Sequence, residues 1–386
     1  MDLGPQSPGE AGPSIPPTSP LPPIPPPIPP AIPPAIPPSI PPAAPPPAPP
    51  PAPPPATAPD PPRRRGRIRR GLAWGCLPVL AVMVVVVLVV VVVVRRNADN
   101  QSISLPADGQ PVPTGPLLTV PGSDAVGTIL TIVQQPWGPR VIGWTSPGGL
   151  SPTDKVPLVI LLHGLGGGPQ LVFGTGSWAD AVSKHRIIVE TPSGVQNSWN
   201  AGGCCLPARA LGVDDVAYLD AVIDDAVKRP NVDPDRIYLV GQSNGGMMAY
   251  RYACTRANRL AGLASVTGTN VAGCEPNAPI PVFNAHGTAD DTVPYNGGTS
   301  LAGVIVAGGT TFPAVPSAVA ATASSMGCGP TAATAGSAPA QSQTWTGCRD
   351  GVSVRLVTIS GGKHDWLSSE GFDTTEELLD FFGLAS

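Results

Sequence analysis

The sequence predicts an α/β protein with a mostly parallel, doubly wound sheet, and three observations support this prediction. Strand-like apolar runs alternate with helical patterns from residue 127 onward. One of those runs leads straight into a Gly-x-Ser-x-Gly turn and then into a helix-forming stretch. About 265 residues follow position 122, a length that suits one large domain better than two small ones.

The composition marks three shorter zones before this domain, which is expected to span residues 123–386. Residues 1–62 hold 31 of the 55 prolines and are expected to form a disordered tail in extended polyproline II conformation. Residues 63–96 are predicted to be an arginine-flanked transmembrane signal anchor. Residues 97–122 are polar, rich in Pro and Gly, and are expected to be a linker.

The predicted membrane span is Gly71–Val94, which carries no charge over 24 residues, whereas a spanning helix needs about 20. A cleaved signal peptide fits less well, because its apolar region has roughly 7 to 15 residues and lies near the start of a chain. Six arginines precede the span and two follow it, so the tail is expected in the cytoplasm and the domain on the extracytoplasmic side. The tail is either a docking site for a partner that binds polyproline II or a spacer, which we favour.

Charge and cysteine content restrict the partners of the C-terminal part. From Asn97 onward the chain holds 14 basic and 23 acidic residues, a balance that argues against nucleic acid or an anionic membrane surface as partner. Cys76 lies in the expected span, and the six other cysteines suit three disulfides in an oxidising compartment. A metal site is the alternative, but the cysteines lack Cys-x-x-Cys spacing and histidine-rich surroundings.

The expected elements alternate along the domain. The predicted strands are Gly127–Val133, Val141–Trp144, Leu158–Leu162, Ile187–Glu190, Ile237–Val240, Ala264–Val266, Val282–Ala285 and Val352–Ile359. The clearest helical pattern is Val213–Lys228, with Asp214 and Asp215 in its first turn and Lys228 in its last. In such a sheet the functional site lies at the carboxyl ends of the strands.

Ser243 is the predicted nucleophile. The Gly-x-Ser-x-Gly pattern alone is weak in a chain with 45 glycines, but here it follows the strand Ile237–Val240 and precedes a helix, as a nucleophile elbow does. Glycines are expected on both sides of the serine because the sharp turn leaves no room for side chains. This context predicts the α/β-hydrolase fold, in which the serine needs a base, an acid and an oxyanion hole.

His364 is the predicted base, because it follows the strand Val352–Ile359 late in the chain, where α/β-hydrolases place it. His163 and His286 each precede a glycine directly after a strand and are interpreted as turn histidines, and His185 as a satisfied histidine before a strand.

Asp290 is the predicted acid, with Asp291 as runner-up. It closes a His-Gly-x-x-Asp turn after the strand Val282–Ala285, and the alternative is a solvated pair of aspartates. The order Ser243, Asp290, His364 is the order expected of this fold.

The predicted oxyanion hole consists of the backbone N–H groups of Asn244 and Leu165, the latter from the glycine-rich loop 163–168. A phosphate-binding loop is the alternative for this segment, but the Lys and Ser/Thr of such loops are missing.

Several motifs in matching order carry a resemblance to a known family. They are Asn197–Cys205, Gly212–Val216, Val232–Arg236, the elbow around Ser243 and His286–Asp290. Over about residues 125 to 384 the chain resembles the secreted polyhydroxybutyrate depolymerase and feruloyl esterase group of α/β-hydrolases. The resemblance implies an ester hydrolase in which Ser243 is the nucleophile, Asp290 the acid and His364 the base.

The resemblance also implies a disulfide between Cys328 and Cys348. Adjacent cysteines rarely bond each other, so Cys204 and Cys205 are expected to pair with Cys254 and Cys274 in an order that stays open. The chain departs from the family in its expected anchor and around His364, where Lys363 replaces a usual glycine and no proline follows Trp366.

The expected mechanism is attack of the serine on an ester carbonyl, followed by hydrolysis of the acyl-enzyme with the same base, and it needs no metal or organic cofactor. Trp199 and Trp366 are expected to wall the substrate cleft, with buried structural tryptophans as the alternative. Three other functions stay open: a serine peptidase of the prolyl-oligopeptidase kind, an envelope acyltransferase, and an anchored binding protein with an inactive hydrolase fold.

Overall fold

The computed structural model describes Met1 and residues 116–119, 126–134, 137–305, 307–330, 332–368 and 371–385. The chain divides into two units, residues 1–71 and 72–386, and every described residue except Met1 belongs to the second. The expected membrane span, the proline-rich tail after Met1 and most of the linker lie outside the described residues. Within the described ranges, no helix is both long and apolar enough to cross a membrane.

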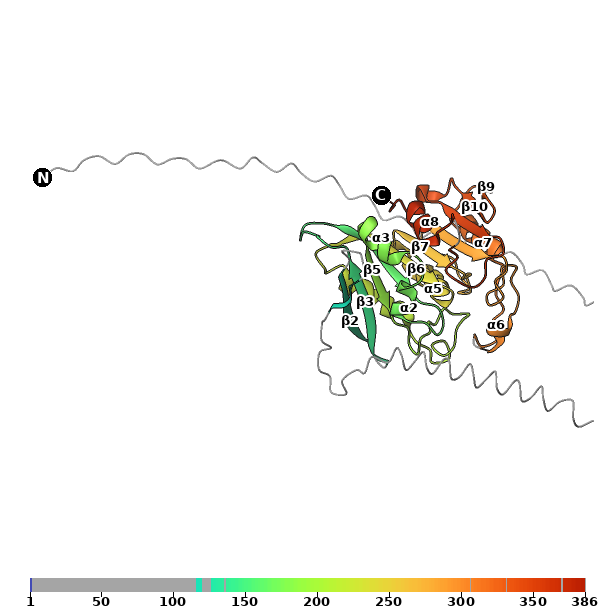
Figure 1. Cartoon of the computed structure of the whole chain (residues 1–386), viewed down its shortest axis with the longest axis horizontal. Helices are drawn as coiled ribbons and strands as arrows, with labels where there is room; N and C mark the ends of the chain where they lie inside the picture. The colour runs from blue at the N-terminus through green and yellow to red at the C-terminus, as the bar shows by residue number, and fades with distance from the viewer. Residues whose placement is uncertain are drawn as a thin grey trace, which may run out of the picture. The chain divides into compact units, whose positions relative to one another are not determined.

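The described strands form one 11-stranded sheet in the order β1-β2-β3-β5-β4-β6-β7-β8-β11-β10-β9 (Figure 1). The strands are β1 Pro116–Thr119, β2 Val126–Gln134, β3 Gly138–Ser146, β4 Val156–Leu162, β5 Ile188–Pro192, β6 Val232–Gln242, β7 Gly262–Val266, β8 Val282–Gly287, β9 Ala333–Ser337, β10 Ala340–Trp345 and β11 Val354–Ile359. The six central strands, from β5 to β11 in this order, run parallel, and the pairs at both ends of the sheet are antiparallel. The predicted α/β class with a mostly parallel sheet is confirmed.

Each predicted strand corresponds to an observed one, and the differences lie at the edges of the sheet. β1 falls in the stretch expected as linker, so the sheet begins before residue 123. The edge hairpin of β9 and β10 has no apolar alternation, and the described side chains of β9 are exposed. An edge strand that faces solvent on both sides has no alternation of apolar and polar residues in its sequence. The periodicity of apolar residues therefore did not predict β9 and β10.

Helices cover both faces of the sheet. They are α2 Pro169–Phe173, α3 Trp178–Lys184, α4 Asp215–Ala226, α5 Asn244–Arg256, α6 Leu301–Ile305, α7 Val315–Ser325 and α8 Thr374–Phe381. Side chains of α4, α5 and α7 enter one core cluster, and those of α2, α3 and α8 enter the other. The helix predicted at Val213–Lys228 is α4, which begins later because the Asp214 carboxylate accepts the backbone N–H of Ala217 at 3.0 Å and caps it.

The strand before the glycine-rich loop 163–168 shows how the two core clusters are separated. In β4, Leu158, Ile160 and Leu162 face one cluster, whereas Val159 and Leu161 face the other. All five are fully buried, as expected for a central parallel strand covered on both faces. Burial of each such side chain contributes about 1.5 to 3 kcal/mol, so this strand is a rigid base for the loop that follows it.

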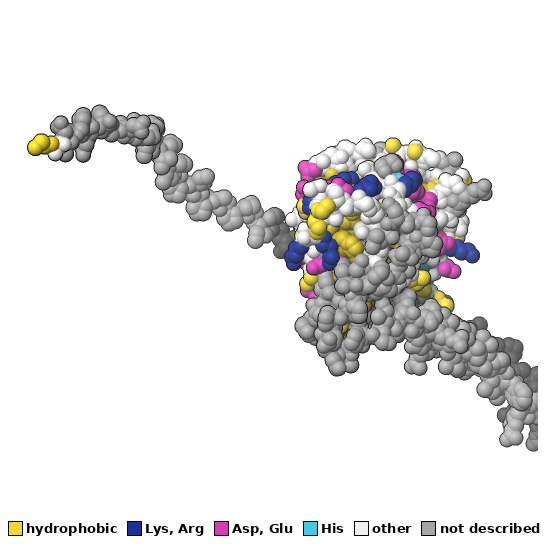
Figure 2. Space-filling model, turned by 60° about the vertical axis from the view of Figure 1, so that its left-hand side comes forward, with side chains coloured by type: hydrophobic (Ala, Val, Ile, Leu, Met, Phe, Trp, Pro, Cys, Tyr) yellow, Lys and Arg dark blue, Asp and Glu magenta, His cyan; other side chains and the backbone are white. Residues whose placement is uncertain are grey.

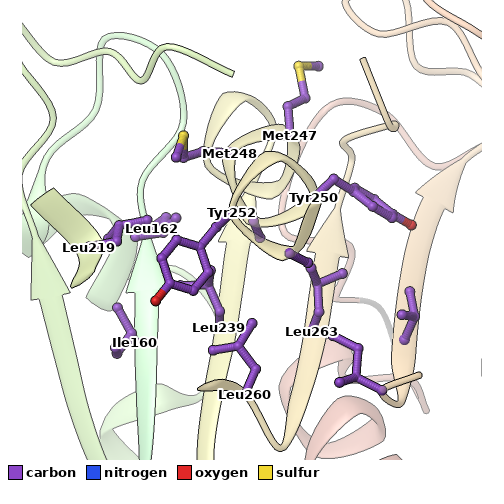
Figure 3. Packing of buried hydrophobic residues seen from close by; sticks show 14 of the residues in the cluster. Ile160, Leu162, Leu219, Leu239, Met247, Met248, Tyr250, Tyr252, Leu260 and Leu263 are labelled. Atoms are coloured by element: carbon purple, nitrogen blue, oxygen red, sulfur yellow. The ribbon is translucent and has the colours of Figure 1, made fainter. Parts of the chain in front are cut away.

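Helix α5 packs directly on the central strands. Figure 3 shows Met248 and Tyr252 of this helix beside Leu162 of β4 and Leu239 of β6, and all four belong to one buried cluster. Because the helix begins at Asn244, this packing fixes the position of the residue directly before it, Ser243.

The described surface carries charges of both signs close together. Figure 2 shows Lys and Arg side chains beside Asp and Glu side chains on the face it presents. Several form ion pairs, such as Arg259 with Asp220 at 2.9 Å and Arg355 with Glu377 at 3.1 Å.

Candidate active site

Ser243 occupies a strained turn between β6 and α5. Its φ and ψ angles are 52° and −119°, a left-handed backbone conformation that is unfavourable for a residue with a side chain. The turn is held from both sides, since the Ser243 N–H donates to the carbonyl of Val266 at 2.8 Å and the Met247 N–H donates to the Ser243 carbonyl at 3.0 Å. This geometry is the nucleophile elbow that the sequence motif indicates.

The flanking glycines are required by close backbone contacts. A Cβ atom at Gly241 would lie closer than 3.0 Å to the backbone of Gly245, and one at Gly245 would lie closer than 3.0 Å to the carbonyl of Leu162. Any side chain at these positions would push α5 away from β4 and β6.

His364 lies between Ser243 and Asp290. Its Nε2 atom is 2.9 Å from Ser243 Oγ, and its Nδ1 atom is 2.7 Å from Asp290 Oδ2. Because the carboxylate accepts, Nδ1 carries the proton and Nε2 is free to accept the serine hydroxyl. The three side chains come from the ends of β6, β8 and β11 of the same parallel sheet, in which β8 and β11 are neighbours and β7 separates β6 from β8.

The loops that carry the acid and the base are tied to each other. The Thr288 N–H donates to Ile359 and the Ala289 N–H to Gly362, both at 2.9 Å. The second carboxylate oxygen of Asp290 accepts the N–H groups of Thr292 at 2.9 Å and Val293 at 2.8 Å. These bonds aim Asp290 at His364 before any substrate binds.

Asp291, the runner-up, does not take part in this arrangement. Its side chain is exposed and accepts only the hydroxyl of Thr292, at 3.4 Å, among the described contacts.

His286, which was interpreted only as a turn histidine, supports the acid. Its Nε2 atom donates to the carbonyl of Val293 at 2.8 Å and lies 3.2 Å from Asp290 Oδ2, with both side chains buried. Burial would raise the pKa of Asp290, but hydrogen bonds from His286 and His364 outweigh it and hold the pKa well below its usual value. Asp290 is therefore ionised at neutral pH.

His163 organises the glycine-rich loop after β4. The Gly194 N–H donates to His163 Nε2 at 2.9 Å, so Nδ1 carries the proton and donates to the carbonyl of Gly164 at 2.7 Å. Burial lowers the pKa of His163 to about 4, which keeps the ring neutral and this pattern intact. The Gly166 N–H donates to Asn197 at 2.8 Å and fixes the other end of the loop.

The two residues expected to supply the oxyanion hole both lie near Ser243. Leu165 lines the two cavities beside Ser243, and Asn244 follows the serine at the start of α5. Neither backbone N–H donates a hydrogen bond to another described residue. The donors of an oxyanion hole must be available in this way to a ligand oxygen.

Trp199 is held below the site rather than in its wall. Its backbone N–H donates to Asn244 Oδ1 at 2.7 Å, and its carbonyl accepts Asn244 Nδ2 at 2.9 Å. The indole N–H donates to the carbonyl of His163 at 3.0 Å, and the side chain is fully buried. The expectation that Trp199 walls the substrate cleft is wrong, because these bonds turn the ring toward the core.

Trp366 does not wall the cleft either. It packs edge-on against Trp178, its indole N–H donates to Thr375 at 2.9 Å, and only 5% of it is exposed. It anchors the segment after His364 to α8, a structural role that was the stated alternative.

Two cavities open beside Ser243 and His364. The first, of about 190 Å³, is called the polar cavity, and its lining residues are His163, Gly164, Leu165, Gly166, Gly167, Leu171, Val172, Gln242, Ser243 and His364. The second, of about 150 Å³, is called the apolar cavity, and its lining residues are Leu165, Cys204, Cys205, Ser243, Met247, Thr292, Val293, Ala302, Gly303, Ala307, Phe312 and His364. The carbonyl group of an ester placed at Ser243 would thus have a cavity on each of two sides, and the two cavities have different linings.

The described cysteines form three disulfides, and two of them correct the expected pairing. Cys328 bonds Cys348, as the family resemblance implied. Cys204 and Cys205 bond each other and Cys254 bonds Cys274, so the expectation that the adjacent cysteines pair elsewhere is wrong. That expectation followed from the rarity of disulfides between adjacent cysteines. In this structure the folded loop between Trp199 and Ala208 keeps the sulfur atoms of Cys204 and Cys205 together and away from Cys254 and Cys274.

A buried polar network lies next to this loop. Arg140 Nη1 is 2.9 Å from Asp215 Oδ1, and Asp215 Oδ2 accepts the Asn200 N–H at 2.7 Å. Burial raises the pKa of Asp215, although the Arg140 charge opposes this. The network connects β3 to the loop that holds the disulfide. From the sequence, Asp215 was expected only in the first turn of a helix. Its partner Arg140 lies 75 positions earlier in the chain, and no local pattern connects the two residues.

Glu190 of β5 is fully buried, and neither carboxylate oxygen has a hydrogen-bond partner in the described part of the chain. Burial raises its pKa to about 8.

The described residues contain no group of three or more His, Cys, Asp or Glu side chains that could hold a metal ion. Beside Ser243 the structure places His364 and, behind it, Asp290 in one hydrogen-bonded series.

Comparisons with known proteins identify the fold and the family. A family model described as the alpha/beta hydrolase fold matches residues 157–320. The chain is 30% identical over 239 residues to "Putative esterase NocK" of Nocardia uniformis subsp. tsuyamanensis, a match that covers 57% of this chain and 68% of that protein. It is 31% identical over 229 residues to feruloyl esterase B of Piromyces equi, covering 56% of this chain but only 41% of that protein.

Among solved structures, the acetyl xylan esterase from Aspergillus awamori is 13% identical and has a TM-score of 0.48, covering 67% of this chain and 99% of that one. At this score the likeness carries no argument about function. The sequence relatives and the matched fold confirm the expected family: the chain belongs to the esterases of the α/β-hydrolase fold, which are carboxylic ester hydrolases.

Proposed function

We propose that this protein is a serine esterase that cleaves carboxylic esters through an acyl-enzyme intermediate. The observation that carries the proposal is the continuous relay from Ser243 Oγ to His364 Nε2 at 2.9 Å and from His364 Nδ1 to Asp290 Oδ2 at 2.7 Å. A serine attacks an ester only when a base takes its proton, and this relay supplies the base and its orienting acid.

In the proposed reaction, His364 takes the Ser243 proton as Oγ forms a bond to the ester carbonyl carbon. The oxyanion accepts hydrogen bonds from the N–H groups of Leu165 and Asn244, and Asp290 stabilises the charged imidazole. The imidazolium then gives its proton to the leaving alcohol, and the C–O bond breaks. A water molecule, deprotonated by His364, releases the carboxylic acid and restores Ser243.

The proposal places this reaction on the extracytoplasmic side of a membrane, with the chain anchored by the span expected at Gly71–Val94. The arginine bias around that span supports the orientation. The three disulfides support an oxidising compartment, since such bonds seldom persist in the cytosol. Protease accessibility of residues 123–386 in intact cells would test the orientation.

The test of the reaction is a kinetic comparison of the full-length protein with its Ser243→Ala variant on p-nitrophenyl acetate, p-nitrophenyl butyrate and methyl ferulate. We expect kcat to fall by about 10³-fold or more, because no other nucleophile remains at the elbow. A fluorophosphonate probe should label the wild type and not the variant.

Equal activity in both proteins would contradict the proposal. Absence of both activity and labelling in a folded wild type would favour the inactive binding protein instead.

A further inference from the structure

The apolar cavity beside Ser243 has an unusual wall. The bonded pair Cys204 and Cys205 lines it, together with Met247 of α5 and side chains of the segment 292–312. Both cysteines are almost completely buried, at 0% and 3% exposure, and among the described cavities beside Ser243 they line only this one.

We infer that the Cys204–Cys205 disulfide is the specificity-determining wall of the acyl pocket, and that this pocket takes a small apolar acyl group. The inference rests on the proposed esterase function. It concerns which group of the ester enters which cavity, not whether the ester is cleaved.

The contacts of the disulfide loop fix the wall relative to the nucleophile. The Cys205 N–H donates to the carbonyl of Trp199 at 3.2 Å, and the same carbonyl accepts Asn244 Nδ2 at 2.9 Å. The Gly203 N–H donates to Val271 at 3.0 Å. The residue after the serine and the disulfide therefore share one rigid partner, Trp199, and the distance from wall to nucleophile is set by backbone bonds.

A second part of the cavity wall is tied to the same loop. It consists of Ala302, Gly303, Ala307 and Phe312. The Thr310 hydroxyl donates to the carbonyl of Gly203 at 3.0 Å, which bridges the two parts. Because the two parts of the wall are linked in this way, the width of the cavity is fixed. The cavity therefore selects acyl groups by their size.

The chemistry of the lining selects an apolar group. A disulfide offers no N–H or O–H donor, and its sulfur atoms are large and polarisable, so they contact hydrocarbon favourably. An apolar cavity of about 150 Å³ holds a group about as large as benzene, which corresponds to a short acyl chain or one ring. The polar cavity, lined by Gly164, Gly166 and Gln242, offers backbone polar groups to the alcohol part of the ester.

The experiment compares three full-length proteins: wild type, the wall variant Cys204→Ala/Cys205→Ala, and the control variant Cys254→Ala/Cys274→Ala. The control removes a disulfide whose second cysteine is exposed and which does not line either cavity among the described residues. One substrate series keeps the p-nitrophenyl group and varies the acyl chain from acetate through butyrate to octanoate. A second series keeps acetate and varies the alcohol.

We expect the ratio of kcat/KM for octanoate to that for acetate to rise about tenfold in the wall variant, because loss of two sulfur atoms widens the pocket. The control should keep the wild-type ratio. A folded, active wall variant with the wild-type ratio would overturn the inference, and so would a change confined to the alcohol series.

A second variant covers the case in which the wall variant does not fold. Ala302 faces the same cavity from the short helix α6 and is partly exposed, so Ala302→Leu should narrow the pocket without disturbing the core. We expect it to lower the ratio for butyrate over acetate at least fivefold, and an unchanged ratio would overturn the acyl assignment. Failure of the proposed function is distinguishable, because then the wild type itself would neither cleave any ester nor react with a fluorophosphonate.

Discussion

The two halves of the active site are built in different ways. The half that carries Asp290 and His364 consists of two loops at neighbouring strand ends, joined by backbone bonds and partly open to solvent, with 20% of the His364 side chain exposed. The half that carries the oxyanion donors is held by buried side chains, above all His163, Trp199 and Asn244. In the proposed reaction, the first half moves protons and must meet the substrate, whereas the second keeps the N–H groups of Leu165 and Asn244 in position.

This difference predicts that changes in the first half abolish chemistry, while changes in the second half weaken both chemistry and folding. Variants on each side, with matched controls, test the distinction.

The largest effect is expected from Asp290→Asn. The amide keeps the size of the side chain but no longer stabilises the imidazolium or the required tautomer, so kcat should fall by about 10⁴-fold. Asp291→Asn is the matched control, since that side chain is exposed and does not contact His364. Steady-state kinetics on p-nitrophenyl butyrate would measure both. If Asp291→Asn were the more damaging change, our assignment of the acid would be incorrect.

A smaller effect is expected from Asn244→Ala. This change keeps the backbone N–H of the oxyanion hole but removes both side-chain bonds to Trp199. We expect kcat to fall by about 10- to 100-fold with KM nearly unchanged, and the free energy of unfolding to fall by about 1 to 3 kcal/mol.

Asn277→Ala is the control for Asn244→Ala, because the Asn277 side chain also accepts a backbone N–H, that of Ala257 at 3.0 Å, away from the serine. It should reduce stability without reducing kcat. Equal kinetic losses in the two variants would show that kcat reports general stability and not the position of the oxyanion donors.

The smallest effect concerns stability alone and comes from Glu190. Its pKa is raised by burial to about 8 in the folded protein, against 4.5 when exposed. Between these two pH values the unfolded chain has released a proton that the folded protein keeps, so stability falls as the pH rises through this window. Glu190→Gln, which cannot ionise, should remove this decline and increase the free energy of unfolding at pH 8 by about 1 to 3 kcal/mol.

Denaturant unfolding at pH 5 and pH 8 would measure the effect of Glu190→Gln. The control is Glu376→Gln, because contacts with Lys184 and His185 lower the pKa of Glu376 against the effect of its partial burial. Its carboxylate contributes stability that is lost only as the pH falls below about 4.5, so between pH 5 and pH 8 that variant should keep the wild-type decline. A wild-type protein equally stable at both pH values would contradict the assignment for Glu190.

Much of the first half could be predicted from the sequence. The turn around Ser243 needs glycines at 241 and 245 because backbone atoms occupy the space of a Cβ, and this requirement leaves a local pattern. Asp290 and His364 follow strands whose apolar character is evident, and chain order alone suggests their roles. Parallel neighbouring strands then bring the three residues together.

The second half left no comparable pattern. His163 and His286 precede glycines in the same way, yet one organises the oxyanion loop and the other supports the acid, because different segments pack over them. The bond between Cys204 and Cys205 and the position of Trp199 depend on contacts with residues 244 and 271, far away in the chain. The spacing of residues within one segment of the sequence does not predict contacts between distant segments.

The sequence by itself therefore determined the α/β class, the elbow and the order of the expected catalytic residues, because strand periodicity and close turns are local consequences of backbone sterics. Only the tertiary structure decided the disulfide pairing, the buried pair of Arg140 with Asp215, and the two cavities beside the serine. Each of these depends on which side chains meet after the sheet has formed, and packing between distant segments is a property of the whole domain.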